Sequence, residues 1–249
     1  MNLTVGEASL YVHKLNEKIQ AHRSVEISLA PTMLCLQPLS LQIDRRKFSL
    51  AAQNLYWRDE GAYTGEVSAH QLRGLVKYAI IGHSERRHVF NEHDRDIRAK
   101  VQASVRNRIV PVLCIGETAF ERSEGETLAV LHDQIVGGLA NLTAEEVSEM
   151  VIAYEPVWAI SAGKDFAHHV TPTAGDVKVA IAGIRRQVEH LFGRKAAKEV
   201  RVLYGGSTNG ANAAEFLGIH DLDGLLIGGA SLSATEFANI VELAHERKK

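Results

Sequence analysis

The stretch Met150-Val151-Ile152-Ala153-Tyr154-Glu155-Pro156-Val157-Trp158-Ala159 decides the fold of this chain. Four apolar residues form a short run that is typical of a parallel strand covered on both faces, and Glu155 followed by Pro156 stands at its end. Proline has no N–H for a strand ladder and keeps the preceding residue out of the helical conformation. We therefore expect the strand to end at Glu155, with the carboxylate at its C-terminal edge, where α/β barrels place their catalytic groups.

Strand-like and helix-like stretches alternate on both sides of this segment. Short runs that are typical of strands occupy residues 25–30, 48–53, 78–82, 110–115, 200–204 and 225–227. The stretches between them repeat apolar residues at helical spacing, as Ile97, Val101 and Val105 do. With the central strand, the chain has seven β-to-α units, each about the length of a right-handed crossover, and no repeated sequence motif. This alternation predicts an α/β fold with a parallel sheet.

The start of the chain does not fit a complete barrel of eight strands. A capping pair, Thr4 and Glu7, precedes apolar residues at helical spacing, so a helix comes where the first strand should be. The pattern alone leaves two alternatives. Either the barrel is incomplete, or an N-terminal strand is missing from this sequence.

The composition favours one globular domain, residues 1–249, because no linker rich in Pro, Ser or Gly divides the chain. Hydrophobic residues make up 45% of the chain and charged residues 23%, a balance that can form a core and argues against disorder. The net charge of −2 offers no basic surface for nucleic acid or a membrane, and no apolar run reaches membrane-spanning length. Cys35 and Cys114 lie far apart without a partner motif, so we expect no disulfide framework and no metal site. A cytoplasmic protein is expected.

Four motifs at the ends of predicted strands resemble the triosephosphate isomerase family. They are Gly82-His83-Ser84-Glu85-Arg86-Arg87, Ala153-Tyr154-Glu155-Pro156-Val157-Trp158-Ala159-Ile160, Tyr204-Gly205-Gly206-Ser207 and Leu226-Ile227-Gly228-Gly229-Ala230-Ser231. The resemblance extends over nearly the whole chain. It implies a TIM (β/α)8 barrel, here lacking its first strand. It also implies interconversion of dihydroxyacetone phosphate and D-glyceraldehyde 3-phosphate through an enediolate, in glycolysis and gluconeogenesis, with no cofactor.

The motifs also imply the catalytic residues. Glu155 matches the family's catalytic base, and His83 matches its electrophile. The family pairs a carboxylate base with a neutral imidazole, and the resemblance implies the same pairing here. The position of His83 agrees, because Ser84 and Glu85 are suited to a helix start, where the helix dipole disfavours an imidazolium. Glu85 is expected to support His83. Without the motif, His83 would be one of 12 histidines and could equally be a solvated side chain.

Phosphate binding is expected at two turns that follow the last two predicted strands. Ser207 comes after a glycine pair, and Gly228 and Gly229 come after the last strand. Barrels of this class bind phosphate at this place with backbone N–H groups and a helix N-terminus. A tight turn between strand and helix would explain each glycine pair as well, so this alternative stays open.

Two loops carry further expectations from the resemblance. The segment after Pro156 resembles the family's closing lid, in which Ser161 stands where the family usually has glycine. Its backbone N–H is expected to meet the phosphate. The loop from Tyr56 to Glu66 resembles the family's interface loop and implies a homodimer, although a mobile surface loop would have the same composition.

The chain departs from the family pattern at its start. The family opens with a strand that ends in Asn-x-Lys, and Met1-Asn2-Leu3 aligns just after it, so strand and lysine are absent from this sequence. Lys14 and Lys18 lie on the first predicted helix and cannot replace that lysine. Losing one preorganised electrostatic partner typically lowers the rate by about 10²–10³. We expect a start codon that was placed too late, with roughly a dozen further residues in the true protein.

Two other functions stay open from the sequence. A phosphate-binding barrel can also be an aldolase or a synthase, but such sites usually need a Schiff-base lysine, and the strand ends at Ser28, Gln53 and Cys114 offer none. The other alternative is a catalytically impaired relative that serves as a binding or structural protein, and the missing lysine is its only support.

Overall fold

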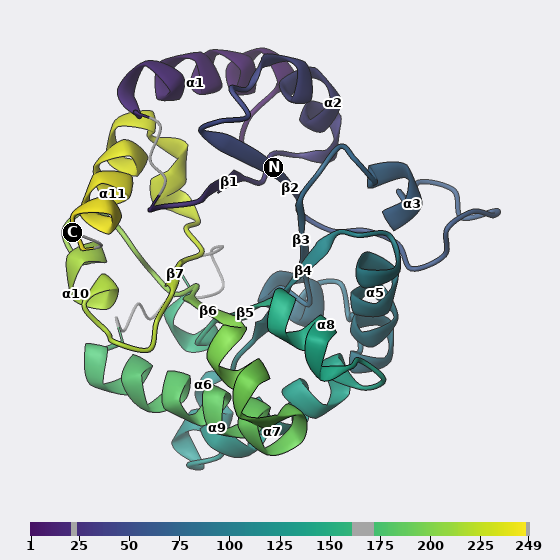
Figure 1. The fold of residues 1–249 in the computed structure, drawn as a ribbon, viewed down its shortest axis with the longest axis vertical. Helices are drawn as coiled ribbons and strands as arrows, with labels where there is room; N and C mark the ends of the chain where they lie inside the picture. The colour runs from purple at the N-terminus through teal and green to yellow at the C-terminus, as the bar shows by residue number, and fades with distance from the viewer. Residues whose placement is uncertain (21–23, 161–171, 248–249) are drawn as a thin grey trace.

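The structure is a computed structural model that describes residues 1–20, 24–160 and 172–247. Figure 1 shows its helices arranged around a group of strands in the centre of the view. Within the described residues, no helix is both long and apolar enough to cross a lipid bilayer.

One curled sheet forms the centre of the molecule, and all of its strands are parallel. The seven strands of the described residues are β1 Ile27–Leu29, β2 Phe48–Ala52, β3 Tyr78–Ile81, β4 Val110–Ile115, β5 Val151–Tyr154, β6 Arg201–Tyr204 and β7 Gly224–Leu225. They pair in chain order from β1 to β7. The predicted α/β barrel type, with seven visible strands, is confirmed.

The predicted alternation of strands and helices is also confirmed. The helices are α1 Val5–Lys18, α2 Met33–Gln42, α3 Ala69–Leu72, α4 Ser84–His88, α5 Asp94–Arg106, α6 Ala119–Ser123, α7 Thr127–Leu139, α8 Ala144–Glu149, α9 Ala174–Glu199, α10 Ala213–Leu217 and α11 Ala234–Glu246. Two 3-10 turns, η1 Val157–Ala159 and η2 Gly229–Leu232, follow β5 and β7. The predicted capping pair starts α1, because Thr4 accepts from the Glu7 N–H and the Glu7 carboxylate accepts from the Thr4 N–H.

The strand β5 is buried on both faces, which explains its continuous apolar run. Val151 and Ala153 belong to the inner cluster with Cys114, while Ile152 and Tyr154 belong to the larger cluster formed with the surrounding helices. Cys114 is fully buried, as expected of a small hydrophobic side chain. Side chains therefore pack against β5 on both faces of the sheet and fix the position of its carboxyl end.

The two edge strands are β1 and β7, and within the described residues each of them pairs with one neighbour only. The last strand is shorter than the predicted 225–227, since regular pairing covers Gly224–Leu225. Leu226 continues toward the neighbouring strand with one bond, from its N–H to Tyr204 O at 2.8 Å. An edge strand forms backbone hydrogen bonds with one neighbouring strand only, so fewer bonds hold its last residues in the sheet.

Candidate active site

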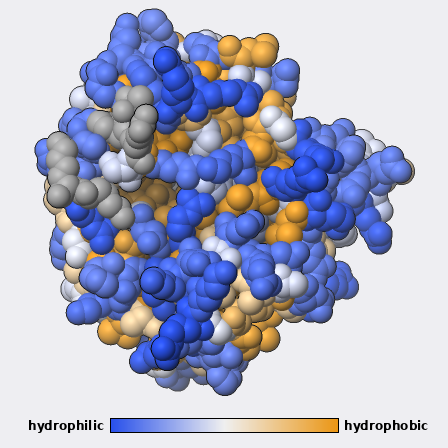
Figure 2. All heavy atoms as spheres, viewed as in Figure 1, coloured by the Kyte–Doolittle hydropathy of each residue, from blue (hydrophilic) through white to orange (hydrophobic). Residues whose placement is uncertain are grey.

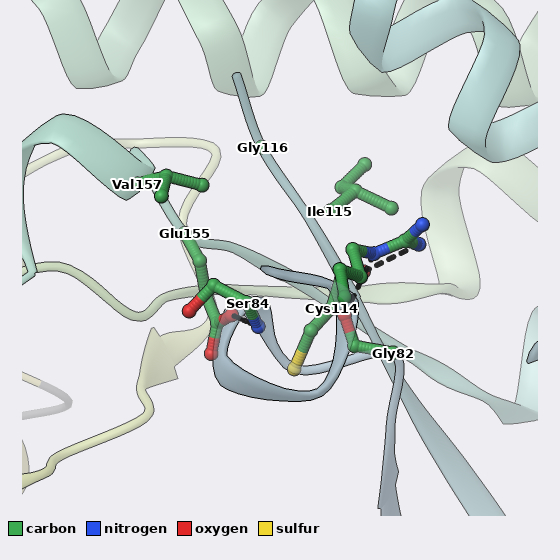
Figure 3. A pocket seen from close by; sticks show the side chains of 8 residues that line it. Gly82, Ser84, Cys114, Ile115, Gly116, Glu155 and Val157 are labelled. Carbon is green, nitrogen blue, oxygen red and sulfur yellow. Dashed lines mark hydrogen bonds between the residues drawn. The ribbon is translucent and has the colours of Figure 1, made fainter. Parts of the chain in front are cut away.

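Glu155 lies at the carboxyl end of β5, and its side chain is 2% exposed. The Ser84 N–H donates to Glu155 Oε2 at 3.0 Å, and Figure 3 shows this bond across a small pocket lined by the ends of β3, β4 and β5. His83 Nε2 lies 3.2 Å from Glu155 Oε1. The ring is not oriented to donate there, and Oε1 has no hydrogen-bond partner among the described residues. The two predicted catalytic side chains are thus adjacent.

The backbone on both sides of Pro156 is bonded to the strand beside it. The Glu155 N–H donates to Ile115 O at 2.7 Å, and the Val157 N–H donates to Glu117 O at 3.0 Å. Proline removes one donor between these two bonds without breaking the pairing. The backbone of the carboxylate is therefore fixed one residue beyond the regular end of β5.

Burial raises the pKa of the Glu155 carboxyl above its usual range. The His83 ring, the Ser84 N–H, the Cys114 thiol and the Arg87 charge each oppose this rise without cancelling it. Removing water from around a carboxylate disfavours its charged form. A carboxylate with a raised pKa binds a proton more strongly than an exposed one, and this is what a general base requires.

His83 occupies the N-cap position of α4, as the sequence predicted for a residue at a helix start. It follows Gly82, whose φ of 72° favours glycine and whose carbonyl accepts from Arg87 Nε at 2.8 Å. The Glu85 N–H donates to His83 Nδ1 at 3.3 Å. With Nδ1 accepting this bond, a neutral ring would carry its proton on Nε2, the nitrogen that faces Glu155. The Glu85 carboxylate is half exposed and 3.9 Å from Nδ1, so Glu85 supports the ring through its backbone.

The two glycine pairs differ in what surrounds them. A Cβ on Gly205 would lie 2.9 Å from Glu155 Cγ, and a Cβ on Gly206 would lie 2.2 Å from the Tyr204 hydroxyl oxygen. Both glycines of this first pair are therefore needed for packing. A Cβ on Gly228 or Gly229 would meet no atom within 4 Å, and neither residue has a positive φ. Neither close packing nor backbone strain requires glycine in the second pair.

Three backbone N–H groups at these turns have no acceptor among the residues that the structure describes. The N–H groups of Ser207, Gly228 and Gly229 donate no hydrogen bond to any residue that the structure describes. Gly228 and Gly229 are exposed, and Ser207 is half-buried. All three follow the carboxyl ends of neighbouring parallel strands, so they lie at the same edge of the sheet as Glu155. Ser161 lies outside the described residues.

A buried carboxylate that the sequence analysis missed lies next to this site. Glu117 is fully buried beyond β4, and it accepts from the Tyr154 hydroxyl at 3.2 Å and from Trp158 Nε1 at 2.8 Å. Glu117 therefore links Tyr154, which precedes Glu155, to Trp158, which follows it. The signal was present in the sequence, because Glu117 follows an apolar run as Glu155 does.

The comparisons with known proteins show the family of this chain. The model of the family "Triosephosphate isomerase" matches residues 1–244. A triosephosphate isomerase of Chloroherpeton thalassium is 46% identical over 220 residues, which cover 88% of this chain and 85% of the relative. Those of Citrifermentans bemidjiense and Clostridium perfringens are 41% and 39% identical over 239 and 242 residues, covering 96% and 97% of this chain and 93% and 95% of the relatives. The chain is thus an isomerase and belongs to the triosephosphate isomerase family.

Proposed function

We propose that this chain interconverts dihydroxyacetone phosphate and D-glyceraldehyde 3-phosphate, with Glu155 as the base and His83 as the electrophile. The observation that carries the proposal is the pair itself. It consists of a buried carboxylate with a raised pKa and an imidazole whose Nδ1 accepts a backbone hydrogen bond and whose Nε2 lies 3.2 Å from the carboxylate. On this proposal the chain acts as a single domain, residues 1–249, in cytoplasmic glycolysis and gluconeogenesis. It needs no cofactor and no metal.

The proposed reaction moves one proton between adjacent carbons. Glu155 Oε1, which makes no hydrogen bond to the described residues, takes a proton from C1 of dihydroxyacetone phosphate. His83 Nε2 donates a hydrogen bond to the carbonyl oxygen, which stabilises the negative charge of the enediolate. The proton then passes from the Glu155 carboxyl to C2, while oxygen-bound protons rearrange to give the aldehyde. No atom is gained or lost, as an isomerisation requires.

The phosphate group is proposed to bind the N–H groups of Ser207, Gly228 and Gly229, which donate to no acceptor among the described residues. Backbone donors that no protein group satisfies are suited to phosphate oxygens, and glycine allows an anion to come close to the main chain. The open space where a side chain of Gly228 or Gly229 would lie agrees with this assignment. Ser161 is proposed as a further backbone donor.

We also propose a homodimer through the loop from Tyr56 to Glu66. This loop projects from the ring of helices beside α3 in Figure 1, and apolar surface lies next to its base in Figure 2. The Tyr56 ring packs on Trp57 and Tyr63 with centroid distances of 4.1 and 4.6 Å, so the loop has internal order. Sedimentation velocity is expected to give the mass of two chains, and a chain without residues 60–65 is expected to be a monomer. A monomeric wild-type chain would overturn this part of the proposal.

The isomerase proposal is tested by steady-state kinetics of the wild-type chain and Glu155→Asp. The shorter side chain withdraws the carboxylate by one methylene, so kcat should fall at least about 100-fold with little change in KM. Glu149→Asp, at the exposed end of α8, is the matched control and should behave as wild type. Equal kcat for Glu155→Asp and wild type would exclude Glu155 as the base. A folded wild-type chain that binds the sugar phosphate without turnover would instead support the catalytically impaired alternative.

A further inference from the structure

The side chain of Gln134, on α7, binds both backbone groups of Gly116, the first residue after β4. The Gly116 N–H donates to Gln134 Oε1 at 2.8 Å, and Gln134 Nε2 donates to Gly116 O at 3.2 Å. A primary amide can form this pair because it carries one acceptor and one donor side by side. Gly116 is buried, so without Gln134 these two groups would lose their partners away from bulk water.

Gly116 lies directly against the backbone of Glu155. A Cβ on Gly116 would lie 1.8 Å from Glu155 O and 2.5 Å from its carbonyl carbon, so only glycine fits. The residues on either side of Gly116 bond to this segment, since Ile115 O accepts from the Glu155 N–H and Glu117 O accepts from the Val157 N–H. Any shift of Gly116 is therefore transmitted to the backbone that carries the Glu155 carboxylate.

The fold places Gln134 at this distance because α7 packs closely on β4. Gly138, four residues along the helix and on the same face, has no Cβ, and one there would lie 2.8 Å from Leu113 Cδ2. Leu131 and Ile135 are buried on this side of the helix. A helix seated so near the strand brings the Gln134 amide to the strand's carboxyl end.

We propose that Gln134 is a positioning residue for Glu155 and acts through Gly116. This inference rests on the proposed role of Glu155 as the base. Proton abstraction from carbon depends on the placement of the carboxylate to within a fraction of an ångström, whereas substrate binding depends on the phosphate donors after β6 and β7. Gln134 therefore affects kcat and leaves KM nearly unchanged.

The first test compares Gln134→Ala with wild type by steady-state kinetics. We expect kcat to fall at least about tenfold and KM to stay within about twofold. The matched control is Gln102→Ala on α5, because Gln102 Nε2 also donates to a backbone carbonyl, Ala140 O at 3.1 Å, but this bond lies at the C-terminal end of α7 and not at Gly116. Its kcat should equal that of wild type. An unchanged kcat for Gln134→Ala would overturn the proposal, as would an equal loss for both variants.

A double-mutant cycle separates positioning from general structural damage. In a Glu155→Asp background the carboxylate is already misplaced, so adding Gln134→Ala should change kcat less than about twofold. A full tenfold loss in both backgrounds would overturn the positioning role. If Glu155→Asp alone keeps the kcat of wild type, the proposed function fails. If Glu155→Asp is slow and Gln134→Ala is not, only the present inference fails.

Gln134→Glu adds a readout that depends on pH and keeps the shape of the side chain, so it remains informative if Gln134→Ala does not fold. An ionised carboxylate accepts from the Gly116 N–H but repels the Gly116 carbonyl, while a protonated carboxyl restores both bonds. The kcat of Gln134→Glu relative to wild type should therefore rise as the pH falls. A ratio that stays constant with pH would contradict the role of the paired bonds.

Discussion

Replacing Gly205 with alanine tests whether the glycine pair after β6 makes room for the base. A Cβ on Gly205 would lie 2.9 Å from Glu155 Cγ and 3.6 Å from its Oε1. The Gly205 N–H donates to Tyr154 O at 2.8 Å, so the backbone at this position is held in place. The Glu155 side chain, not the turn, is expected to move.

The size of the effect follows from that distance. Carbon atoms pack best at about 3.5–4.0 Å, so the Glu155 side chain must retreat by about 0.5–1 Å. A misplacement of about 1 Å can cost about 10² in rate, so we expect kcat to fall about 10- to 100-fold. This corresponds to about 1.4–2.7 kcal/mol of lost transition-state stabilisation. The extra methyl group should cost about 1–3 kcal/mol of stability, which leaves the protein folded.

Steady-state kinetics and thermal unfolding of Gly205→Ala measure both quantities. The matched control is Gly210→Ala on the same connection between β6 and α10, where a Cβ would come no closer than 3.8 Å to Glu236 Cγ. This control should keep the kcat of wild type. A Gly205→Ala protein with the kcat of wild type would refute the argument that this glycine sets the position of Glu155.

The remaining predictions concern the phosphate turn and the buried base. Gly229→Ala should raise KM about tenfold with an unchanged melting temperature, because its Cβ meets open space and would crowd only a bound phosphate; an unchanged KM would contradict a phosphate bound close to Gly229. Glu155→Gln should unfold at a higher urea concentration than wild type at neutral pH. The pKa of Glu155 is raised on folding, so its carboxyl favours the folded state at low pH, and that contribution is lost as pH rises through the folded pKa. The advantage of Glu155→Gln should thus disappear on acidification, and an advantage independent of pH would contradict the buried charge as its cause.

Local sequence pattern was enough to predict the course of the sheet. The run before Glu155 forms β5 because both of its faces are covered, and Thr4 and Glu7 start the first helix as a capping box. The end of the last strand was predicted less well, since the length of an edge strand depends on its single neighbour and not on its own residues.

The candidate catalytic pair was predictable only because its two motifs are recognisable. The alternation of strands and helices in the sequence placed Glu155 and His83 at strand ends. No local pattern shows that their side chains lie 3.2 Å apart or that burial raises the pKa of the Glu155 carboxyl. Both properties depend on strands that are distant in sequence. Placement of the site residues in their catalytic roles remains a prediction.

The supporting contacts could not be predicted from the sequence, for the same reason. Gly116 looks like an ordinary residue at a strand end, and its need for glycine comes from the Glu155 carbonyl, which belongs to the neighbouring strand. Gln134 looks like a polar residue on a helix surface until α7 is packed on β4. Such requirements arise from the packing of separate elements, which periodicity does not encode.

Conversion of dihydroxyacetone phosphate in D2O, followed by NMR of the product, tests the central claim most directly. A carboxylate base that holds the proton during an enediolate step allows exchange with solvent, so the wild-type chain should give D-glyceraldehyde 3-phosphate that carries deuterium at C2. Glu155→Gln should show neither product nor exchange. Product from the wild-type chain that fully retains the substrate hydrogen, or exchange by Glu155→Gln at the wild-type rate, would contradict proton transfer by Glu155.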